Sequence, residues 1–204
     1  IYHSAPSFHQ KMRSSVGVYA LPEQETFNLL FYRKDIMEQL ELEVPQTWDD
    51  LISILPTLQG KNLQVGIPFP SIQAPDMTAF YSLIFQNGGT IYNEKGTKTR
   101  IDSEAGIASF KTYTSLYNSY GLPTIFDFTS RFRSGEMPIG IANYGMYNNL
   151  AVAAPEIRGL WDFTFLPGTE KVDENVRKTF YTLIDKRLKL SDKMTIQQAF
   201  NVLC

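Results

Sequence analysis

Residues 80–96 read FYSLIFQNGGTIYNEKG, which predicts a helix, a glycine stop and a hairpin in direct succession. The first part places apolar side chains at helical spacing, and the Asn-Gly-Gly at 87–89 ends the helix, because glycine adopts the positive φ that helix C-termini favour. Residues 91–93 and 98–101 flank the turn glycine Gly96, a pattern typical of a β-hairpin. The stretch therefore belongs to a domain that mixes helices and strands.

Further helices are predicted from their N-caps. Thr47 is the expected N-cap of one helix, with Asp50 in the capping-box position. Asp76 is the expected N-cap of the helix that includes residues 80–85, and Asp102 that of a long helix after the hairpin. Apolar spacing predicts the buried stripes of the first and last of these helices. They comprise Trp48, Leu51, Ile52, Leu55 and Leu58, and Ile107, Phe110, Thr114 and Tyr117.

Extended segments alternate with these helices along the chain. The expected strands and extended runs are 17–32, 65–67, 138–142 and 161–165. Short helices are expected from Asp35 and around 129–133. The alternation of strands and helices, without a repeat period or a low-complexity tract, predicts a mixed α/β fold in which residues 17–168 form one continuous unit.

The composition excludes several classes of function. Nineteen basic and 21 acidic residues give a net charge of −2, so the chain has no surplus of positive charge for a nucleic-acid backbone. The longest apolar runs, such as 150–154, are far shorter than the ~18 residues that indicate a membrane span. The single cysteine, Cys204, excludes an internal disulfide and a multi-cysteine metal site.

The chain also offers little for nucleophilic or metal catalysis. Its two histidines, His3 and His9, lie in a polar opening stretch that is a poor place for the rigidly held base of a catalytic triad. Three-histidine zinc is impossible, and the HExxH, phosphate-loop and glycine-rich nucleotide motifs are absent. We therefore expect no metal and no cofactor. Carboxylate-pair chemistry stays open, because 21 acids offer many pairs that a fold could bring together.

Taken in order, five segments resemble the sugar- and oligosaccharide-binding family of extracellular solute-binding proteins of bacterial ABC importers. These segments are VYALPEQETFNLLFYRKDI at 18–36, VPQTWDDL at 44–51, the stretch at 80–96, FRSGEMPIGIANY at 132–144 and WDFTFLPG at 161–168. Their order and spacing are those of the family, and the resemblance covers roughly the part of the chain from 18 to 168. Residues 170–193 do not match the family pattern.

The resemblance implies a fold and a place for this chain within it. The fold is a three-layer-like lobe of the class II periplasmic-binding-protein type, with a mixed central sheet flanked by helices. Residues 1–16 are then an upstream connecting segment, 17–168 the second of two lobes, and 169–204 a C-terminal segment that is either a hinge return or part of the first lobe. Because the family closes two lobes on its solute, this chain is expected to supply one wall of a binding site.

The resemblance also implies the function. We expect non-catalytic binding of a sugar or oligosaccharide, which the receptor hands to the membrane subunits of an ABC permease. The protein would act outside the cell, either in the periplasm or as a surface lipoprotein held by an upstream lipid anchor. A carboxylate-dependent glycoside hydrolase and a receptor for a peptide or another non-sugar solute are the alternatives.

Sugar recognition combines aromatic faces, which cover the C–H face of a pyranose, with carboxylates and amides that hydrogen-bond its hydroxyls. By the resemblance, such contacts come from the first crossing segment, from the start of one helix and from the residues after a short strand. The expected contacts are Glu25, Thr26, Asp76, Thr78, Asn143, Tyr144 and Tyr147. Four of them have a structural alternative: Glu25 as a solvated loop acid, Asp76 as a helix cap and the two tyrosines as packing beneath the lobe.

Overall fold

The computed structural model describes residues 13–14, 17–18, 27–70, 76–171, 173–175 and 178 of the 204. The chain divides into two compact units, Asn28–Lys171 and a smaller one made of Ile1–Phe27 with Val172–Cys204. In the smaller unit, β1 (Arg13–Ser14) pairs antiparallel with β2 (Gly17–Val18). The larger unit holds the main sheet and the core.

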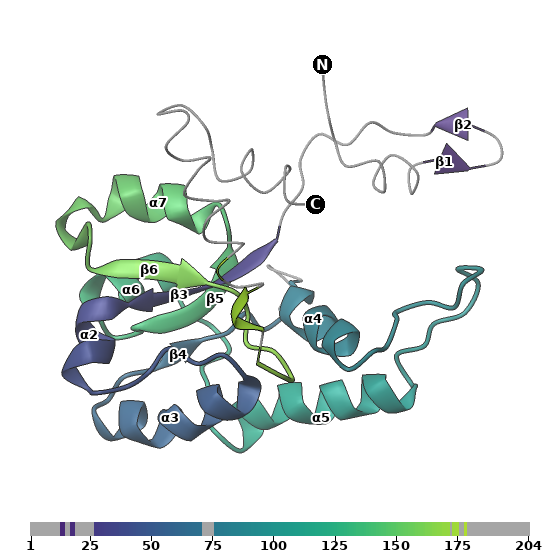
Figure 1. Cartoon of the computed structure of the whole chain (residues 1–204), viewed down its shortest axis with the longest axis horizontal. Coiled ribbons are helices and arrows are strands. Elements are labelled where there is room, and N and C mark those ends of the chain that lie inside the picture. The colour runs from purple at the N-terminus through teal and green to yellow at the C-terminus, as the bar shows by residue number, and fades with distance from the viewer. Residues whose placement is uncertain are drawn as a thin grey trace. The chain divides into compact units, whose positions relative to one another are not determined.

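A four-stranded mixed sheet with the order β4-β5-β3-β6 forms the centre of the larger unit (Figure 1). Strand β3 (Asn28–Arg33) pairs antiparallel with β5 (Ile139–Asn143) on one side and with β6 (Trp161–Thr164) on the other. Strand β4 (Val65–Gly66) pairs parallel with β5. The sheet confirms the predicted mixed α/β fold and the predicted strands near 65, 139 and 161.

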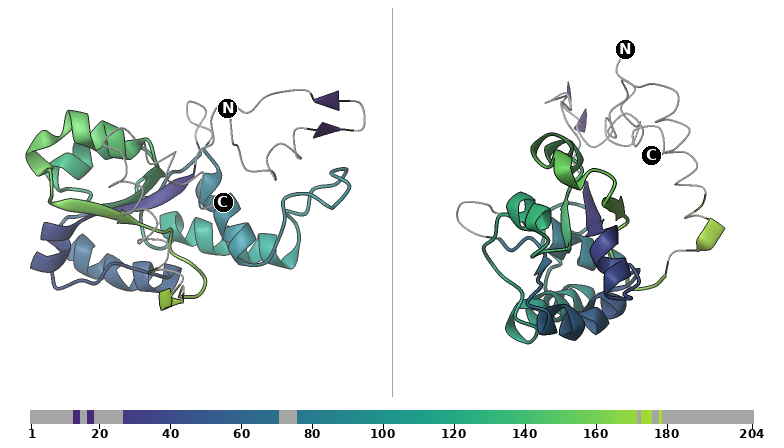
Figure 2. Two further views of the ribbon diagram at one scale, coloured as in Figure 1. Left: turned by 45° about the horizontal axis from the view of Figure 1, so that its top comes forward. Right: turned by 90° about the vertical axis from the view of Figure 1, so that its left-hand side faces the viewer.

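Helices cover both faces of the sheet, as both Figure 1 and the left panel of Figure 2 show. Leu30, Ile139 and Ile141 face the core formed with α3 (Trp48–Gly60), α4 (Thr78–Gln86) and α5 (Glu104–Asn118). Phe31 contacts Trp161, which packs against Phe132 of α6 and Tyr147 of α7. The remaining helical elements are α2 (Lys34–Gln39), α6 (Phe128–Ser134), α7 (Met146–Ala153) and the 3-10 turn η1 (Pro155–Ile157).

Helix α3 begins as its sequence predicts. The hydroxyl of Thr47 accepts the backbone N–H of Asp50 at 3.0 Å, and the Asp50 carboxylate accepts the backbone N–H of Thr47 at 3.0 Å, which completes the capping box. Burial raises the pKa of Asp50, but its hydrogen bonds with Thr47 and with the backbone at Gln46 and Thr47 outweigh burial and lower it. Trp48 is buried in the core, as expected.

Two expected helix starts are wrong by one residue. Met77, not Asp76, is the N-cap of α4, and Asp76 instead accepts the backbone N–H of Thr78 at 2.8 Å in a local turn. Ser103, not Asp102, caps α5 by accepting the backbone N–H of Gly106 at 3.2 Å. The causes differ. At α5, Asp102 and Ser103 are adjacent residues with short polar side chains, and spacing alone does not rank them as caps. At α4, Met77 is the N-cap without a side-chain hydrogen bond.

The expected buried face of α5 is also wrong. Its buried residues are Gly106, Ser109, Tyr113 and Leu116, whereas Ile107 and Phe110 are 48% and 57% exposed. The small residues decide this, because Gly106 lies against the Ile101 carbonyl and leaves no space for a Cβ. The Ser109 hydroxyl donates to Ala105 and accepts from Asn87 at the end of α4. Helix α5 therefore packs close through its small side and leaves larger apolar side chains outside.

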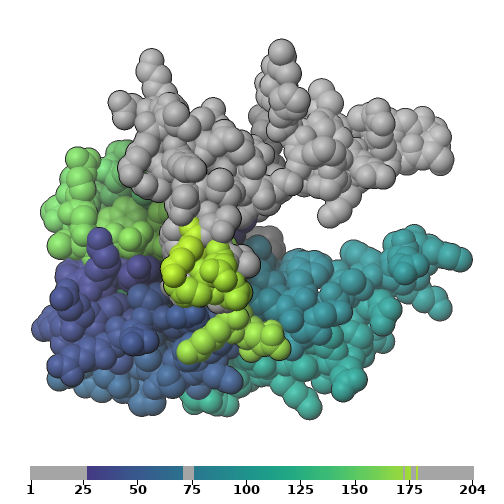
Figure 3. Space-filling view, in the orientation of Figure 1, coloured from purple at the N-terminus to yellow at the C-terminus, as the bar shows by residue number. Residues whose placement is uncertain are grey.

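The predicted hairpin has one antiparallel bridge, between Tyr92 and Thr99, and its turn residue Gly96 has a φ of 66°. The segment that carries it projects from the body of the larger unit (Figure 3). In the described parts of the chain, no helix is both long and apolar enough to cross a membrane.

Candidate functional site

A groove of about 770 Å³ lies where the parallel strands β4 and β5 end and where α4 and α7 begin. Ligands of open α/β sheets characteristically bind outside the carboxyl ends of such strands. The walls combine aromatic and aliphatic side chains with a carboxylate and an amide. The lining residues are Pro68, Phe69, Asp76, Thr124, Ile125, Phe126, Phe128, Ile141, Ala142, Asn143 and Met146.

Two tyrosines of α5 hold one wall of the groove in place. The Tyr113 hydroxyl donates to the carbonyl of Pro68 at 2.6 Å, and the Tyr117 hydroxyl donates to the carbonyl of Ile67 at 3.1 Å. The Phe69 ring meets the Tyr117 ring edge-on at 4.6 Å. Burial raises the pKa of both phenols, so they stay protonated donors at neutral pH. The segment after β4 is thereby fixed from behind.

The polar groups of the groove come from both of its sides. Asp76 stands before α4 and Asn143 at the end of β5. Asn28, the register partner of Asn143 on β3, has a buried Nδ2 atom without a hydrogen-bond partner. A buried donor without an acceptor is costly, so this edge of the sheet has polar capacity that the described residues leave unused.

The structure brings two of the seven expected contacts to the groove, Asp76 and Asn143. Thr78 is exposed and is not among the lining residues, and its hydroxyl donates to the carboxylate of Asp76. Tyr147 packs edge-on against Trp161 at 5.4 Å and Phe163 at 6.0 Å. Tyr144, which is half-buried, is not among the lining residues. Glu25 and Thr26 lie outside the described residues.

Sequence reasoning missed the apolar part of the groove. Residues 124–128, TIFDF, run from Pro123 into the first residue of α6 and contribute four of the lining side chains. The sequence did contain a signal for it: residues 124–128 hold three large apolar residues outside the expected helices and strands, and a cluster of this kind can mark a binding surface. Ile125 is 84% exposed, which is unusual for an isoleucine without a partner surface.

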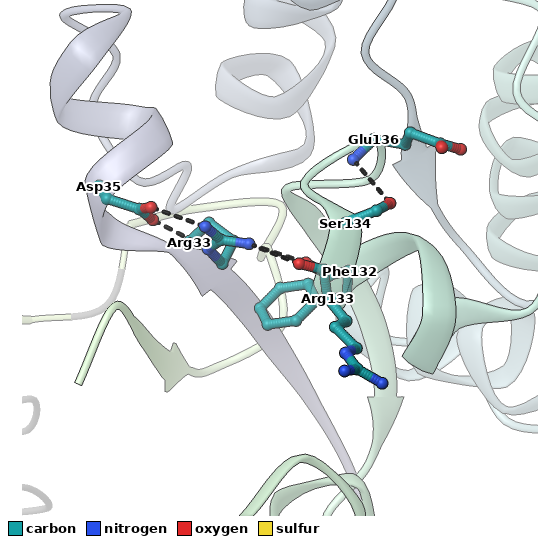
Figure 4. Close-up of polar contacts among 6 residues, drawn as sticks. All are labelled: Arg33, Asp35, Phe132, Arg133, Ser134 and Glu136. Atoms are coloured by element: carbon teal, nitrogen blue, oxygen red, sulfur yellow. Dashed lines mark hydrogen bonds and ion pairs between the residues drawn. The ribbon is translucent and has the colours of Figure 1, made fainter. Parts of the chain in front are cut away.

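A buried arginine anchors the helix that carries Phe128 into the groove (Figure 4). Arg33, 7% exposed at the end of β3, donates to the carbonyls of Phe132 and Arg133 at the C-terminus of α6, at 3.0 and 3.2 Å. It also pairs with both carboxylate oxygens of Asp35 at 2.9 and 2.6 Å. The hydrogen bond from Arg33 holds the pKa of Asp35 below its ordinary value of 3.8.

Residues 4–185 match the sequence model of the bacterial extracellular solute-binding proteins. The chain belongs to this family. The match confirms the resemblance seen in the five segments, and it also includes residues 170–185, which were expected to lie outside the family pattern. No curated protein matches the sequence of this solute-binding protein. Among the described residues, no group of histidine, cysteine or acidic side chains could hold a metal ion.

Three solved structures of similar fold share 20–22% sequence identity with this chain. An ABC-transporter solute-binding protein from Thermotoga lettingae, bound with α-D-tagatose, is 21% identical with a TM-score of 0.71, covering 83% of this chain and 46% of its own. Maltose-bound MalE3 of T. maritima is 22% identical with a TM-score of 0.67 at the same coverages. The GacH receptor of Streptomyces glaucescens is 20% identical with a TM-score of 0.66, covering 81% and 44%. This solute-binding protein thus spans less than half the length of these neighbours.

Proposed function

We propose that this solute-binding protein binds a sugar or oligosaccharide without catalysing its conversion, and passes it to an ABC permease. The observation that carries the proposal is the composition of the groove. Phe69 and Phe128 offer aromatic surface for the apolar face of a sugar ring, and Asp76 and Asn143 offer acceptors and donors for hydroxyls. Its volume of about 770 Å³ is within the range of small-molecule sites.

In this proposal, residues 17–168 are the second lobe of a two-lobed receptor, and the groove is one wall of its cleft. Asp76 and Asn143 are the principal polar contacts, while Thr78 positions the Asp76 carboxylate through its hydroxyl. Glu25, Thr26, Tyr144 and Tyr147 remain proposed contacts of the sugar. The receptor acts outside the cell, held by an upstream lipid anchor or free in the periplasm.

The known ligands of proteins with this fold support the carbohydrate class. Three similar solved structures contain tagatose, acarbose and maltose, respectively, as bound molecules. The hydrolase alternative needs two carboxylates facing one site. Of the described residues that line the groove, Asp76 is the single carboxylate, which gives that alternative no support.

The test is thermal unfolding of the complete two-lobed receptor, in which the groove faces its opposite wall, with a panel of tagatose, maltose, acarbose, glycerophosphocholine and short peptides. A sugar that binds the folded state at 100 times its Kd adds about 2.7 kcal/mol to the free energy of unfolding. At least one sugar should raise the midpoint. A rise with peptides alone would favour the peptide receptor, and flat curves with every sugar would refute the carbohydrate proposal.

A matched pair of variants localises the binding. Asn143→Ala removes a groove amide, and the loss of about 1 kcal/mol per hydrogen bond should weaken sugar binding roughly fivefold. Asn148→Ala changes an exposed amide of α7 that is not among the lining residues, and should leave the affinity unchanged. Equal affinities in the two variants would place the sugar elsewhere.

A further inference from the structure

Two glycines lie side by side on the sheet where the groove ends. Gly66 on β4 and Gly140 on β5 are register partners in the parallel pair. Their neighbours Val65, Ile139 and Ile141 point to the core beneath α3 and α5, so the glycines present the opposite face, toward α6. Neither has a positive φ, so the backbone does not require glycine at these positions.

The space above these glycines is occupied by aromatic rings. A Cβ on Gly66 would stand 2.5 Å from Met137 Sδ, 2.9 Å from Phe128 Cδ2 and 3.1 Å from Phe126 Cε2. A Cβ on Gly140 would overlap the same Phe128 ring at Cε2 and would lie 2.6 Å from the Gly66 carbonyl oxygen. The two glycines thus make a patch of bare backbone against which the Phe128 ring lies.

The same ring forms part of the groove, and its other neighbours limit where it can go. Phe128 and Phe126 both line the groove, and Phe128 is 7% exposed. The ring of Phe132, which is fully buried, lies 5.1 Å from that of Phe128, centroid to centroid. A side chain on the glycine patch would therefore push the Phe128 ring along the sheet toward the open groove.

We propose that Gly66 and Gly140 are specificity-determining residues: by leaving room for Phe128 against the sheet, they set the depth of the groove and so the size of the sugar it admits. The size-selection part rests on the proposed function, whereas the placement of Phe128 does not. A Cβ at either position would make the groove shallower and would disfavour the larger of two related sugars.

The placement is tested without any sugar, by crystal structures of the unmodified protein and of Gly66→Ala. Gly66 is the better site, because its added methyl group meets only side-chain ends, whereas Gly140 also faces backbone. The Phe128 ring should shift toward Asn143 in the variant. Overpacking should lower the unfolding midpoint by roughly 3–10 °C. An unshifted ring would overturn the proposal.

Two further variants separate this effect from simple damage to the fold. Gly60→Ala is the matched control, because nothing lies within 4 Å of its added Cβ and the residue ends α3. It should leave the groove unchanged and should keep or slightly raise the midpoint, because alanine has the higher helix propensity. Adding Phe128→Leu to Gly66→Ala should reverse part of the decrease in midpoint, because the smaller leucine side chain leaves room for the added methyl group. If Phe128→Leu lowers the midpoint of Gly66→Ala by as much as it lowers that of the unmodified protein, the two residues do not pack directly against each other.

Size selection is then measured by calorimetry with tagatose and maltose. Relative to the unmodified protein, Gly66→Ala should lower the ratio of maltose to tagatose affinity at least threefold, and Phe128→Leu should raise it. A ratio that stays constant while the ring shifts would overturn the specificity role. If neither sugar binds the unmodified protein, the proposed function fails for these sugars, and the crystal structures still decide whether the glycines set the depth of the groove.

Discussion

At the scale of single residues, Arg33 shows how a buried charge can serve the fold. Its guanidinium donates to two carbonyls at the end of α6 and is itself paired with Asp35, so all three of its side-chain nitrogens have an acceptor. The residue stands in a strand that reads as apolar, and only the packing of α6 against β3 explains why it is buried.

The first prediction follows from this pair. Because Arg33 lowers the pKa of Asp35 in the folded state, the pair's contribution to stability is present above pH 3.8, the ordinary Asp value, and is lost as the pH falls below it. Asp35→Asn should reduce the fall in unfolding free energy between about pH 5 and pH 2, measured by urea unfolding. Glu38→Gln, an exposed change in the same helix α2, should keep the original slope. Identical slopes in both variants would contradict the assigned role.

At the scale of elements, the capping box of α3 joins two distant parts of the chain. Thr47 and Asp50 cap the start of the helix. The backbone N–H of the adjacent Trp48 donates at 3.0 Å to the carbonyl of Gly168, which follows β6 in the chain. This helix start therefore supports both its own first turn and the exit from the sheet.

The second prediction tests that helix start. Thr47→Ala leaves the Asp50 N–H without its side-chain acceptor and should lower the free energy of unfolding by about 1 kcal/mol. Thr57→Ala, an exposed change within the same helix, should be neutral or slightly stabilising, because alanine has the higher helix propensity. Chemical denaturation of the two variants side by side measures the difference. Equal changes in the free energy of unfolding of the two variants would contradict the capping role of Thr47.

At the scale of the whole larger unit, the sheet is a layer buried on both faces. Phe31 is fully buried in the central strand, with its ring 6.0 Å from those of Trp161 and Phe163. Phe110 is 57% exposed on α5, although its spacing predicts burial. The two phenylalanines look alike in the sequence and differ only in what the fold places around them.

The third prediction compares them directly. Phe31→Ala should cost about 4 kcal/mol of unfolding free energy, because it opens a cavity between the sheet and the α6–α7 layer. Phe110→Ala should cost less than about 1 kcal/mol. Urea unfolding monitored by tryptophan fluorescence reports both, and the Trp161 signal reports the Phe31 site directly. A comparable loss for Phe110 would mean that its outer face is covered.

Much of this architecture is legible from the chain alone. The capping box at Thr47, the glycine stop at 87–89 and the strands near 65, 139 and 161 follow from local rules that a few neighbouring residues satisfy together. The family follows from five such segments in order, which residues 4–185 confirm. Local chemistry suffices here, because caps and turns depend on atoms within a few residues of one another.

The groove, the buried face of α5 and the setting of Arg33 needed the tertiary structure. Each depends on residues far apart in the chain: Gly66 and Gly140 meet only when β4 pairs with β5, and Phe128 reaches them only from α6. The periodic spacing of apolar residues predicts a buried face from large side chains. Close packing of one helix on another, or of a ring on a sheet, depends instead on where small residues lie. A glycine or serine at such a position allows a neighbouring side chain to approach closely. Which neighbour approaches is decided only when the chain folds.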